Sequence, residues 1–210
     1  MAEKLSRRAF SQTGAATVLG LTALQASRVL GANERIRLGF IGIGGRGKQV
    51  ASAFSQHADA EIVALCDVSR STVEEANARL TEGKAGIFGD FRKLLDQKDI
   101  DAVVIATPDH WHAIQTTMAC RAGKDVYCEK PLSKTIREGR HMVNTARETK
   151  RVVQVGTHRR SGVSYAEAAK LIASDKLGKV TVARAFDTTN MFPLGIGKAV
   201  PSDPPADLDW

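Results

Sequence analysis

A glycine-rich turn between a strand pattern and a helix pattern constrains this chain more than any other feature. Residues 37–47 read Arg-Leu-Gly-Phe-Ile-Gly-Ile-Gly-Gly-Arg-Gly, an apolar run that leads directly into the glycines. Gly42, Gly44 and Gly47 fill a G-x-G-x-x-G pattern, which provides a tight turn, a close approach of the backbone to a pyrophosphate, and close packing of helix on strand. The helix that begins near Arg46 would present its positive end to the phosphates. Taken alone, the motif also fits a glycine turn that binds nothing.

An acidic residue stands where a dinucleotide site needs one. The apolar stretch 61–66 ends in Asp67, about 20 residues after Gly47, which is the usual spacing for a ribose-binding acid. A carboxylate there accepts hydrogen bonds from both hydroxyls of the adenosine ribose and repels a 2′-phosphate. The pattern therefore favours NAD over NADP. NADP stays possible, because Arg46 and Arg70 could lie close enough to the 2′-phosphate to weaken the preference for NAD.

Strand and helix patterns alternate along the chain from about residue 35 to residue 156. Short alternating elements of this kind indicate right-handed crossovers and a parallel sheet that is covered on both faces. The predicted fold class is α/β with a doubly wound parallel sheet, and the predicted domain spans residues 33–156. Beyond the glycine turn, strands are expected at 61–66, 102–106, 125–128 and 152–155, and helices at 70–80, 91–95, 110–121 and 135–149.

Composition excludes several classes of protein. With 43% hydrophobic and 25% charged residues among 210, the chain is neither disordered nor collagen-like. Its formal net charge is +7, but acids are interspersed among the basic residues and no basic run with interleaved aromatics occurs, so nucleic-acid binding is not expected. Cys66, Cys120 and Cys128 form no C-x-x-C pair, which argues against a disulfide framework or a zinc site.

The first 32 residues are predicted to be an export signal. Residues 6–10 read Ser-Arg-Arg-Ala-Phe, a twin-arginine pattern, and residues 13–24 are mildly apolar but too few to span a membrane. We therefore expect recognition by the twin-arginine export machinery and a periplasmic or otherwise exported protein, with no stable membrane span. An ordinary amphipathic first helix is the alternative.

Polar residues follow two of the predicted strands. Residues 107–112 read Thr-Pro-Asp-His-Trp-His, and residues 129–131 read Glu-Lys-Pro. Ligands of open parallel sheets bind outside the carboxyl ends of the strands, so both loops are expected beside the glycine turn, where the nicotinamide half of a cofactor would lie. His110 and His112 would point apart at a helix start, which favours contact with cofactor or substrate over metal binding.

Three motifs in this order and spacing resemble the Gfo/Idh/MocA family of NAD(P)-dependent oxidoreductases. They are residues 42–47, residues 106–112 and residues 129–131, and the resemblance covers the chain from about residue 33 onward. Residues 154–161 are similar to a segment of the secreted, twin-arginine-signalled bacterial branch. The resemblance implies a Rossmann fold and hydride transfer between the nicotinamide and a carbinol carbon of a sugar or polyol.

The resemblance also assigns roles to individual residues. Lys130 matches the lysine that hydrogen-bonds the reacting substrate oxygen and helps to move its proton. Glu129 would hold the nicotinamide ribose, and Pro131 would fix the loop so that Lys130 points across the cofactor. The residues expected to bind the cofactor are Gly42, Gly44, Gly45, Arg46, Gly47, Asp67, Thr107, Pro108, His112 and Glu129.

Residues 157–210 are expected to form only the start of an α+β second domain, with a helix at 163–174 and a strand at 180–187. A lone strand cannot bury its own face, so its apolar side chains should be exposed. In the family this domain supplies the general acid/base His, its Asp partner and the usual homo-oligomer interface. The resemblance thus implies a truncated chain, and a homo-oligomer only if the domain is complete. His158, where related sequences tend to have Gln, is expected near the cleft.

Three functions are compatible with these observations. The first is an oxidoreductase, and the second is a dinucleotide-binding module without a complete catalytic site. The third is a methyltransferase, since a glycine turn with a later acid also suits S-adenosylmethionine. The Glu-Lys-Pro loop argues against the third, because methyl transfer needs no lysine beside a nicotinamide.

Overall fold

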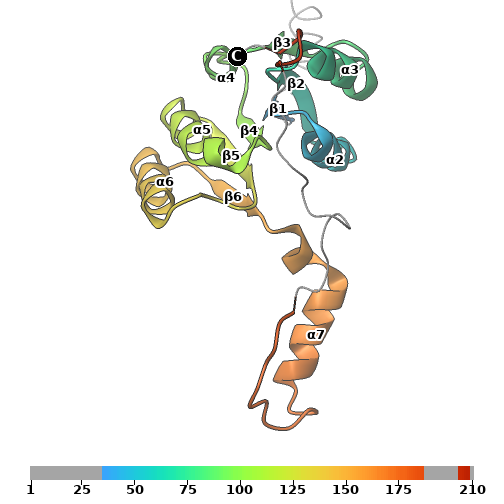
Figure 1. Cartoon of the computed structure of the whole chain (residues 1–210), viewed down its shortest axis with the longest axis vertical. Helices are drawn as coiled ribbons and strands as arrows, with labels where there is room; N and C mark the ends of the chain where they lie inside the picture. Colours follow the sequence, from blue (N-terminus) through green and yellow to red (C-terminus); the bar gives the residue numbers. More distant parts are fainter. Residues whose placement is uncertain (1–34, 187–202, 209–210) are drawn as a thin grey trace, which may run out of the picture.

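A six-stranded parallel sheet forms the centre of the molecule in the computed structural model, which describes residues 35–186 and 203–208 (Figure 1). The strands lie in the order β3-β2-β1-β4-β5-β6. The order reverses between β1 and β4, which creates a crevice at the carboxyl ends of these strands. The predicted doubly wound α/β fold is confirmed. The strands are β1 (Ile36–Ile41), β2 (Ala60–Cys66), β3 (Gly86–Phe88), β4 (Ala102–Ile105), β5 (Asp125–Glu129) and β6 (Val153–Gly156).

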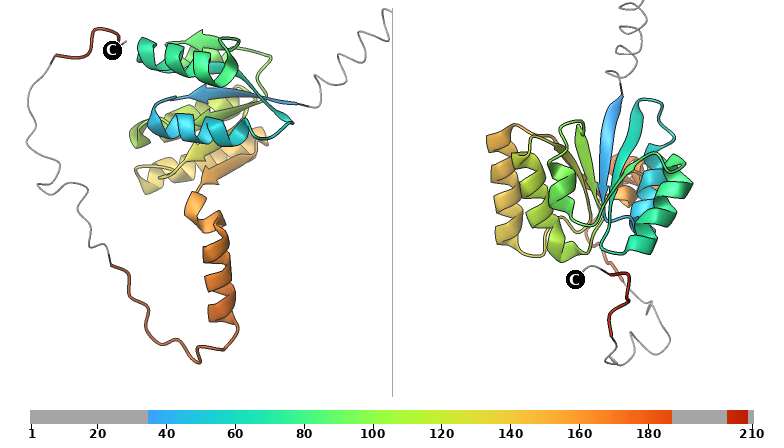
Figure 2. Two further views of the ribbon diagram at one scale, coloured as in Figure 1. Left: turned by 90° about the vertical axis from the view of Figure 1, so that its right-hand side faces the viewer. Right: turned by 90° about the horizontal axis from the view of Figure 1, so that it is seen from above.

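Helices cover both faces of the sheet (Figure 2). Phe40 and Val104 are buried in the cluster beneath α2 and α3, whereas Ile41, Val103 and Ile105 are buried in the cluster beneath α4, α5 and α6. Consecutive strand residues thus enter opposite halves of the core, which explains why the central strands are apolar without alternation. The helical elements are α2 (Gly45–Phe54), α3 (Arg70–Thr81), α4 (Phe91–Leu95), α5 (Asp109–Arg121), α6 (Ile136–Thr149), the 3₁₀ turn η1 (His158–Ser161) and α7 (Val163–Ala173).

Side-chain caps define where several helices begin. Ser69 accepts a hydrogen bond from the backbone N–H of Thr72 at the start of α3, and Asp90 caps α4 in the same way. Thr135 and Glu138 form a reciprocal capping box at the start of α6. Each such cap contributes about 1 kcal/mol. Because capping residues are visible in the sequence, the predicted helix starts agree with the structure to within one residue.

The structure differs from the sequence-based expectation at two strands. β3 was not predicted, because it has three residues and pairs only with β2 at the edge of the sheet. The strand predicted at 180–187 is wrong for the residues described, since 180–186 adopt no regular structure. No neighbouring strand pairs with them among the described residues, and their side chains, such as Phe186 at 79% exposed, stay in solvent as expected. Asp187 lies outside the described residues.

The helix predicted at 163–174 is confirmed as α7, and it projects away from the sheet (Figure 1). None of its residues is buried, and Val163, Tyr165 and Ile172 are each more than half exposed. Among the described residues, no helix combines the length and the apolar character that crossing a membrane requires. The export signal predicted for residues 1–32 lies outside the described residues.

Candidate functional site

The glycine turn connects β1 to α2 in a conformation that the other residue types would not adopt easily. Gly42 has a φ of +85°, and its N–H donates to the carbonyl of Cys66 at 2.8 Å. A Cβ atom at Gly47 would overlap the carbonyl oxygen of Gly42, so α2 can approach the turn only with glycine there. By contrast, a Cβ at Gly44 or Gly45 would meet no atom within 4 Å. This side of the turn is open to a ligand.

The start of α2 offers backbone donors to that open side. The helix begins at Gly45, its N-cap Gly44 has no side chain to accept a hydrogen bond, and no acidic residue lies in the first turn. Its first N–H groups therefore lack side-chain partners, and the helix dipole adds positive potential. A pyrophosphate fits these donors, as the motif predicted.

Asp67 follows β2 directly and lies beside the same turn. Its Oδ2 accepts from the backbone N–H of Ile43 at 2.9 Å, and its Oδ1 accepts from the N–H of Ser69 at 3.1 Å. A carboxylate has roughly four acceptor positions, so about two stay available for other donors. The residue is thus held in place by the backbone and can still accept the two hydroxyls of a ribose.

The two arginines that could favour NADP each pair with a glutamate. Arg46 Nη2 lies 2.7 Å from Glu129 Oε1, and Arg70 Nε lies 2.8 Å from Glu74 Oε1. Arg70 is also largely exposed, with 81% of its side chain in solvent. Among the described residues neither guanidinium forms an ion pair with Asp67, but Arg70 and Glu74 line the same cavity as Asp67, so the preference for NAD over NADP stays a prediction.

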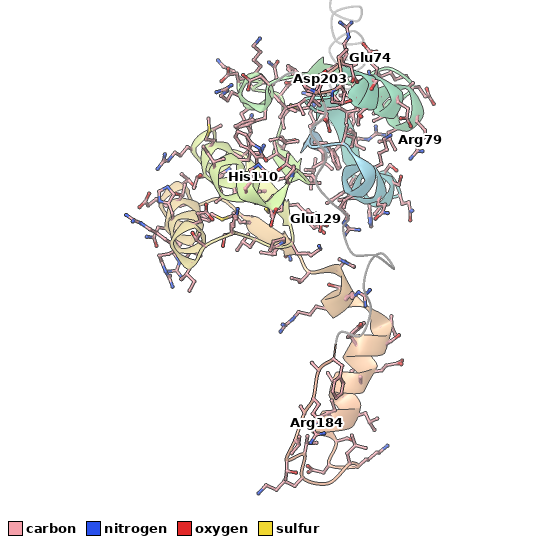
Figure 3. All side chains as sticks on the ribbon, viewed as in Figure 1. Glu74, Arg79, His110, Glu129, Arg184 and Asp203 are labelled. Atoms are coloured by element: carbon pink, nitrogen blue, oxygen red, sulfur yellow. The ribbon has the colours of Figure 1, made fainter. Side chains whose placement is uncertain are left out.

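The ion pair between Arg46 and Glu129 joins the glycine-turn helix to the end of β5, 83 residues away in sequence. Glu129 is almost fully buried, and its hydrogen bond to Arg46 is the main cause that raises the pKa of the guanidinium. Burial and the nearby Glu129 raise the pKa of Tyr127. A Cβ at Gly156 of the neighbouring strand β6 would come within 2.9 Å of both Tyr127 and Glu129, so a larger residue at this position would crowd these two side chains. Figure 3 shows Glu129 at this edge of the sheet.

Lys130 comes directly after Glu129, at the carboxyl end of β5. Its backbone N–H donates to Glu129 Oε2 at 3.2 Å, its side chain is exposed, and its peptide bond to Pro131 is cis. The structure thus places the predicted catalytic lysine at the same edge of the sheet as the glycine turn. The exposed ammonium is accessible to a substrate.

His112 connects the two loops that carry the predicted nicotinamide-side residues. The side chain is 1% exposed, with Nδ1 at 2.6 Å from the carbonyl oxygen of Pro131 and Nε2 at 2.9 Å from that of Thr107. A neutral imidazole has one N–H and donates to one of these carbonyls. Thr107 itself donates to Gln115 of α5 at 2.7 Å, and Pro108 is the N-cap residue of that helix. His112 was expected to contact the cofactor, but its ring is buried with both nitrogens on backbone carbonyls, so it holds the two loops together instead.

The remaining candidate residues take no part in this arrangement. His110 is exposed whereas His112 is buried, so the two rings point apart, and no group of three or more His, Cys, Asp or Glu side chains within 35–186 and 203–208 could hold a metal ion. His158 opens η1 after β6 and is exposed. Cys66, Cys120 and Cys128 are free and buried, and burial raises the pKa of the first to about 12 and of the last to about 11.

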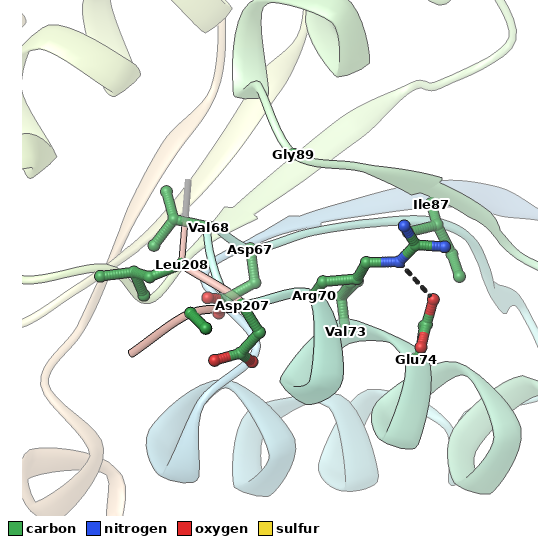
Figure 4. Close-up of a pocket in the computed structure, with 10 residues that line it drawn as sticks. Asp67, Val68, Arg70, Val73, Glu74, Ile87, Gly89, Asp207 and Leu208 are labelled. Carbon is green, nitrogen blue, oxygen red and sulfur yellow. Dashed lines mark hydrogen bonds and ion pairs between the residues drawn. The ribbon is translucent and has the colours of Figure 1, made fainter. Parts of the chain in front are cut away.

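A cavity of about 560 Å³ lies at the Asp67 end of the site (Figure 4). The ends of β2 and β3 and the start of α3 form one side of it. The other side consists of Ala206, Asp207 and Leu208, and Asp207 lies 138 residues after Ser69 at the start of α3. This contribution was not predicted, because nothing in the Pro- and Asp-rich end of the chain indicates where it packs. Ser69 and Ser71 could have been noted as polar residues at a helix start.

Comparison with known proteins identifies the family in which this fold and these motifs occur together. Residues 36–157, more than half of the chain, match the Gfo/Idh/MocA oxidoreductase family with its NAD-binding Rossmann fold. A 1,5-anhydro-D-fructose reductase from Ensifer adhaerens is 37% identical over 101 residues, which cover 48% of this chain and 30% of that protein. A scyllo-inositol 2-dehydrogenase (NAD(+)) from Bacillus subtilis is 33% identical over 94 residues, covering 45% of this chain and 28% of that protein.

Solved structures lead to the same family. The scyllo-inositol dehydrogenase from Lactobacillus casei, solved with NAD(H) and scyllo-inositol, has a TM-score of 0.65 at 31% identity over 70% of this chain and 43% of that one. The WlbA dehydrogenase from Bordetella pertussis, in complex with NADH and UDP-GlcNAcA, has a TM-score of 0.64 at 30% identity over 69% and 43%. The chain thus matches less than half the length of these proteins. It belongs to the Gfo/Idh/MocA family of oxidoreductases, with the NAD-binding Rossmann fold of that family.

Proposed function

We propose that this chain binds NAD(H) and, within the whole protein, takes part in hydride transfer between the nicotinamide and a carbinol carbon of a sugar or polyol. One observation carries the proposal. At a single edge of the sheet, the uncapped start of α2, Asp67 and the Glu129-Lys130-Pro131 loop lie together. Sugar and inositol dehydrogenases among the relatives support this substrate class.

Each part of this edge has a task in binding. The backbone N–H groups at the start of α2 hold the pyrophosphate, and Asp67 accepts the adenosine ribose hydroxyls. The family resemblance assigns the nicotinamide ribose to Glu129, whose buried carboxylate pairs with Arg46 and so also fixes the end of β5 against α2. Bound NAD supplies the hydride acceptor, which no amino-acid side chain provides.

Lys130 acts on the substrate. Its ammonium donates a hydrogen bond to the oxygen on the reacting carbon, which orients that carbon. As the hydroxyl is oxidised to a carbonyl, the lysine stabilises the negative charge that develops on the oxygen, while the hydroxyl proton passes to a general base. In the family the general acid/base His and its Asp partner belong to the second domain. We therefore expect residues 1–210 alone to bind NADH but to oxidise sugars poorly.

The test combines binding and turnover. NADH titrated into the 210-residue chain should bind, and Asp67→Ala should weaken binding by about 10- to 100-fold, since charge-assisted hydrogen bonds contribute about 1.5–3 kcal/mol. Lys130→Met should leave the NADH affinity of this chain unchanged. In the protein isolated from the cell that produces it, the same substitution should abolish sugar-dependent NADH formation. If S-adenosylmethionine binds and NADH does not, or if Lys130→Met abolishes NADH binding, the proposal is wrong.

We further propose that the protein is exported by the twin-arginine machinery, on the basis of the Arg7-Arg8 pair and the short apolar stretch that follows. Changing both arginines to lysine should retain the protein in the cytoplasm. Fractionation of cells that express either form measures this, and equal export of both would contradict the proposal.

A further inference from the structure

The segment that contains Asp207 is attached to the start of α3, where it borders the Asp67 end of the site (Figure 4). Ser69 and Leu208 form an antiparallel bridge, and the N–H of Arg70 donates to the Asp207 carbonyl at 3.1 Å. Backbone contacts at Asp207 itself and at the next residue, Leu208, thus hold the Asp207 side chain over the first turn of the helix.

The Asp207 carboxylate accepts from every polar donor that it reaches there. Its Oδ2 accepts from the hydroxyl of Ser71, from the hydroxyl of Ser69 at 3.1 Å and, more weakly, from the N–H of Ser71 at 3.4 Å. These hydrogen bonds lower the pKa of Asp207, so it is ionised at neutral pH. The donors at the start of α3 are therefore engaged by a negative charge from the chain itself.

Ser69 links this carboxylate to the ribose-binding acid. Its backbone N–H donates to Asp67, while its hydroxyl donates to Asp207. Two carboxylates therefore flank one serine at the end of β2. The neighbouring cationic side chain, Arg70, lines the same cavity and pairs there with Glu74.

We propose that Asp207 determines selectivity for NAD(H) against NADP(H). A 2′-phosphate on the adenosine ribose would enter the cavity that Asp67 and Asp207 line together, next to the Ser69 and Ser71 hydroxyls that donate to Asp207. Hydroxyls and N–H groups at a helix start are the donors that a phosphate needs, but here Asp207 already occupies them with a like charge. The chain thus excludes the phosphate through a residue 138 positions after Ser69. This inference rests on the proposed NAD(H) binding.

The experiment compares the dissociation constants of NADH and NADPH for the full chain and its variants. Asp207→Ala should strengthen NADPH binding about tenfold or more and change NADH binding less than twofold. Asp207→Asn should shift the ratio in the same direction, since it removes the charge and keeps the shape. Asp203→Asn is the matched control: Asp203 lies in the same segment, is exposed and forms no hydrogen bond among the described residues, so its ratio should match the wild type.

A double variant tests whether phosphate binding needs the hydroxyl donor or only the loss of the Asp207 charge. In Asp207→Ala combined with Ser71→Ala, most of the gain in NADPH affinity should disappear, because a donor for the phosphate is missing. An unchanged ratio in both Asp207 variants would overturn the inference, and so would an equal gain for both nucleotides, which would mean that the segment only obstructs the site. If the wild-type chain binds NADH but the Asp207 variants keep its ratio of NADH to NADPH affinity, only this inference is contradicted. Chain that binds neither nucleotide contradicts the proposed function as well.

Discussion

His110 and His112 stand two positions apart at the start of α5, and replacing each with alanine compares an exposed ring with a buried one. The His112 ring is 1% exposed and contacts the carbonyl oxygens of Thr107 and Pro131. His112→Ala removes a hydrogen bond worth about 1 kcal/mol and leaves a cavity that costs about 2 kcal/mol more. We expect the free energy of unfolding to fall by about 3 kcal/mol. For a chain of this size the melting temperature should fall by about 6–12 °C.

His110→Ala is the matched control, because it removes the same side chain from an exposed position on the same helix. Exposed substitutions usually change stability by less than about 0.5 kcal/mol. Urea unfolding followed by circular dichroism measures both variants against the wild type. If the two variants unfold within about 0.5 kcal/mol of each other, His112 does not join the two loops and the reasoning is wrong.

Three further predictions concern the turn, a buried thiol and a helix cap. Gly47→Ala should weaken NADH binding at least tenfold, because its Cβ would overlap the Gly42 carbonyl, whereas Gly45→Ala, with open space, should keep the fold; titration and thermal melting measure both. Burial raises the pKa of Cys66 to about 12 from 9.0, so the folded state keeps a proton that the unfolded state releases. Stability should therefore fall above pH 9 by up to about 1.4 kcal/mol per pH unit, a slope that urea unfolding at several pH values should show to be smaller in Cys66→Ala. Thr135→Ala should cost about 1 kcal/mol in the same unfolding assay through loss of the capping box, and no loss would contradict that role.

The order of elements could be predicted because local rules govern it. Gly42, Gly44 and Gly47 mark the turn, apolar runs mark the central strands, and Thr135 marks a helix start. The predicted strand at 180–187 shows the limit of these rules. Its alternation satisfies the strand pattern, but a strand forms only where a neighbour accepts its backbone hydrogen bonds, and residues 180–186 have none among the described residues.

The candidate site was predictable in part for the same reason. The carboxyl ends of parallel strands meet at one edge, so residues at the ends of these strands gather there, and the structure has Asp67, Thr107 and Glu129 at that edge. The burial of His112 and the pairing of Arg46 with Glu129 were not predictable. They depend on which way a side chain points and on which distant group it meets.

The sequence by itself determined the doubly wound sheet, the glycine turn and the edge where ligand-binding residues gather, since periodicity and turn chemistry act over a few residues. Tertiary structure alone decided that His112 supports two loops, that Arg46 pairs across 83 residues and that Asp207 covers the start of α3. These contacts join segments far apart in the chain. Their partners are chosen by packing in three dimensions, and no local pattern of residues encodes that choice.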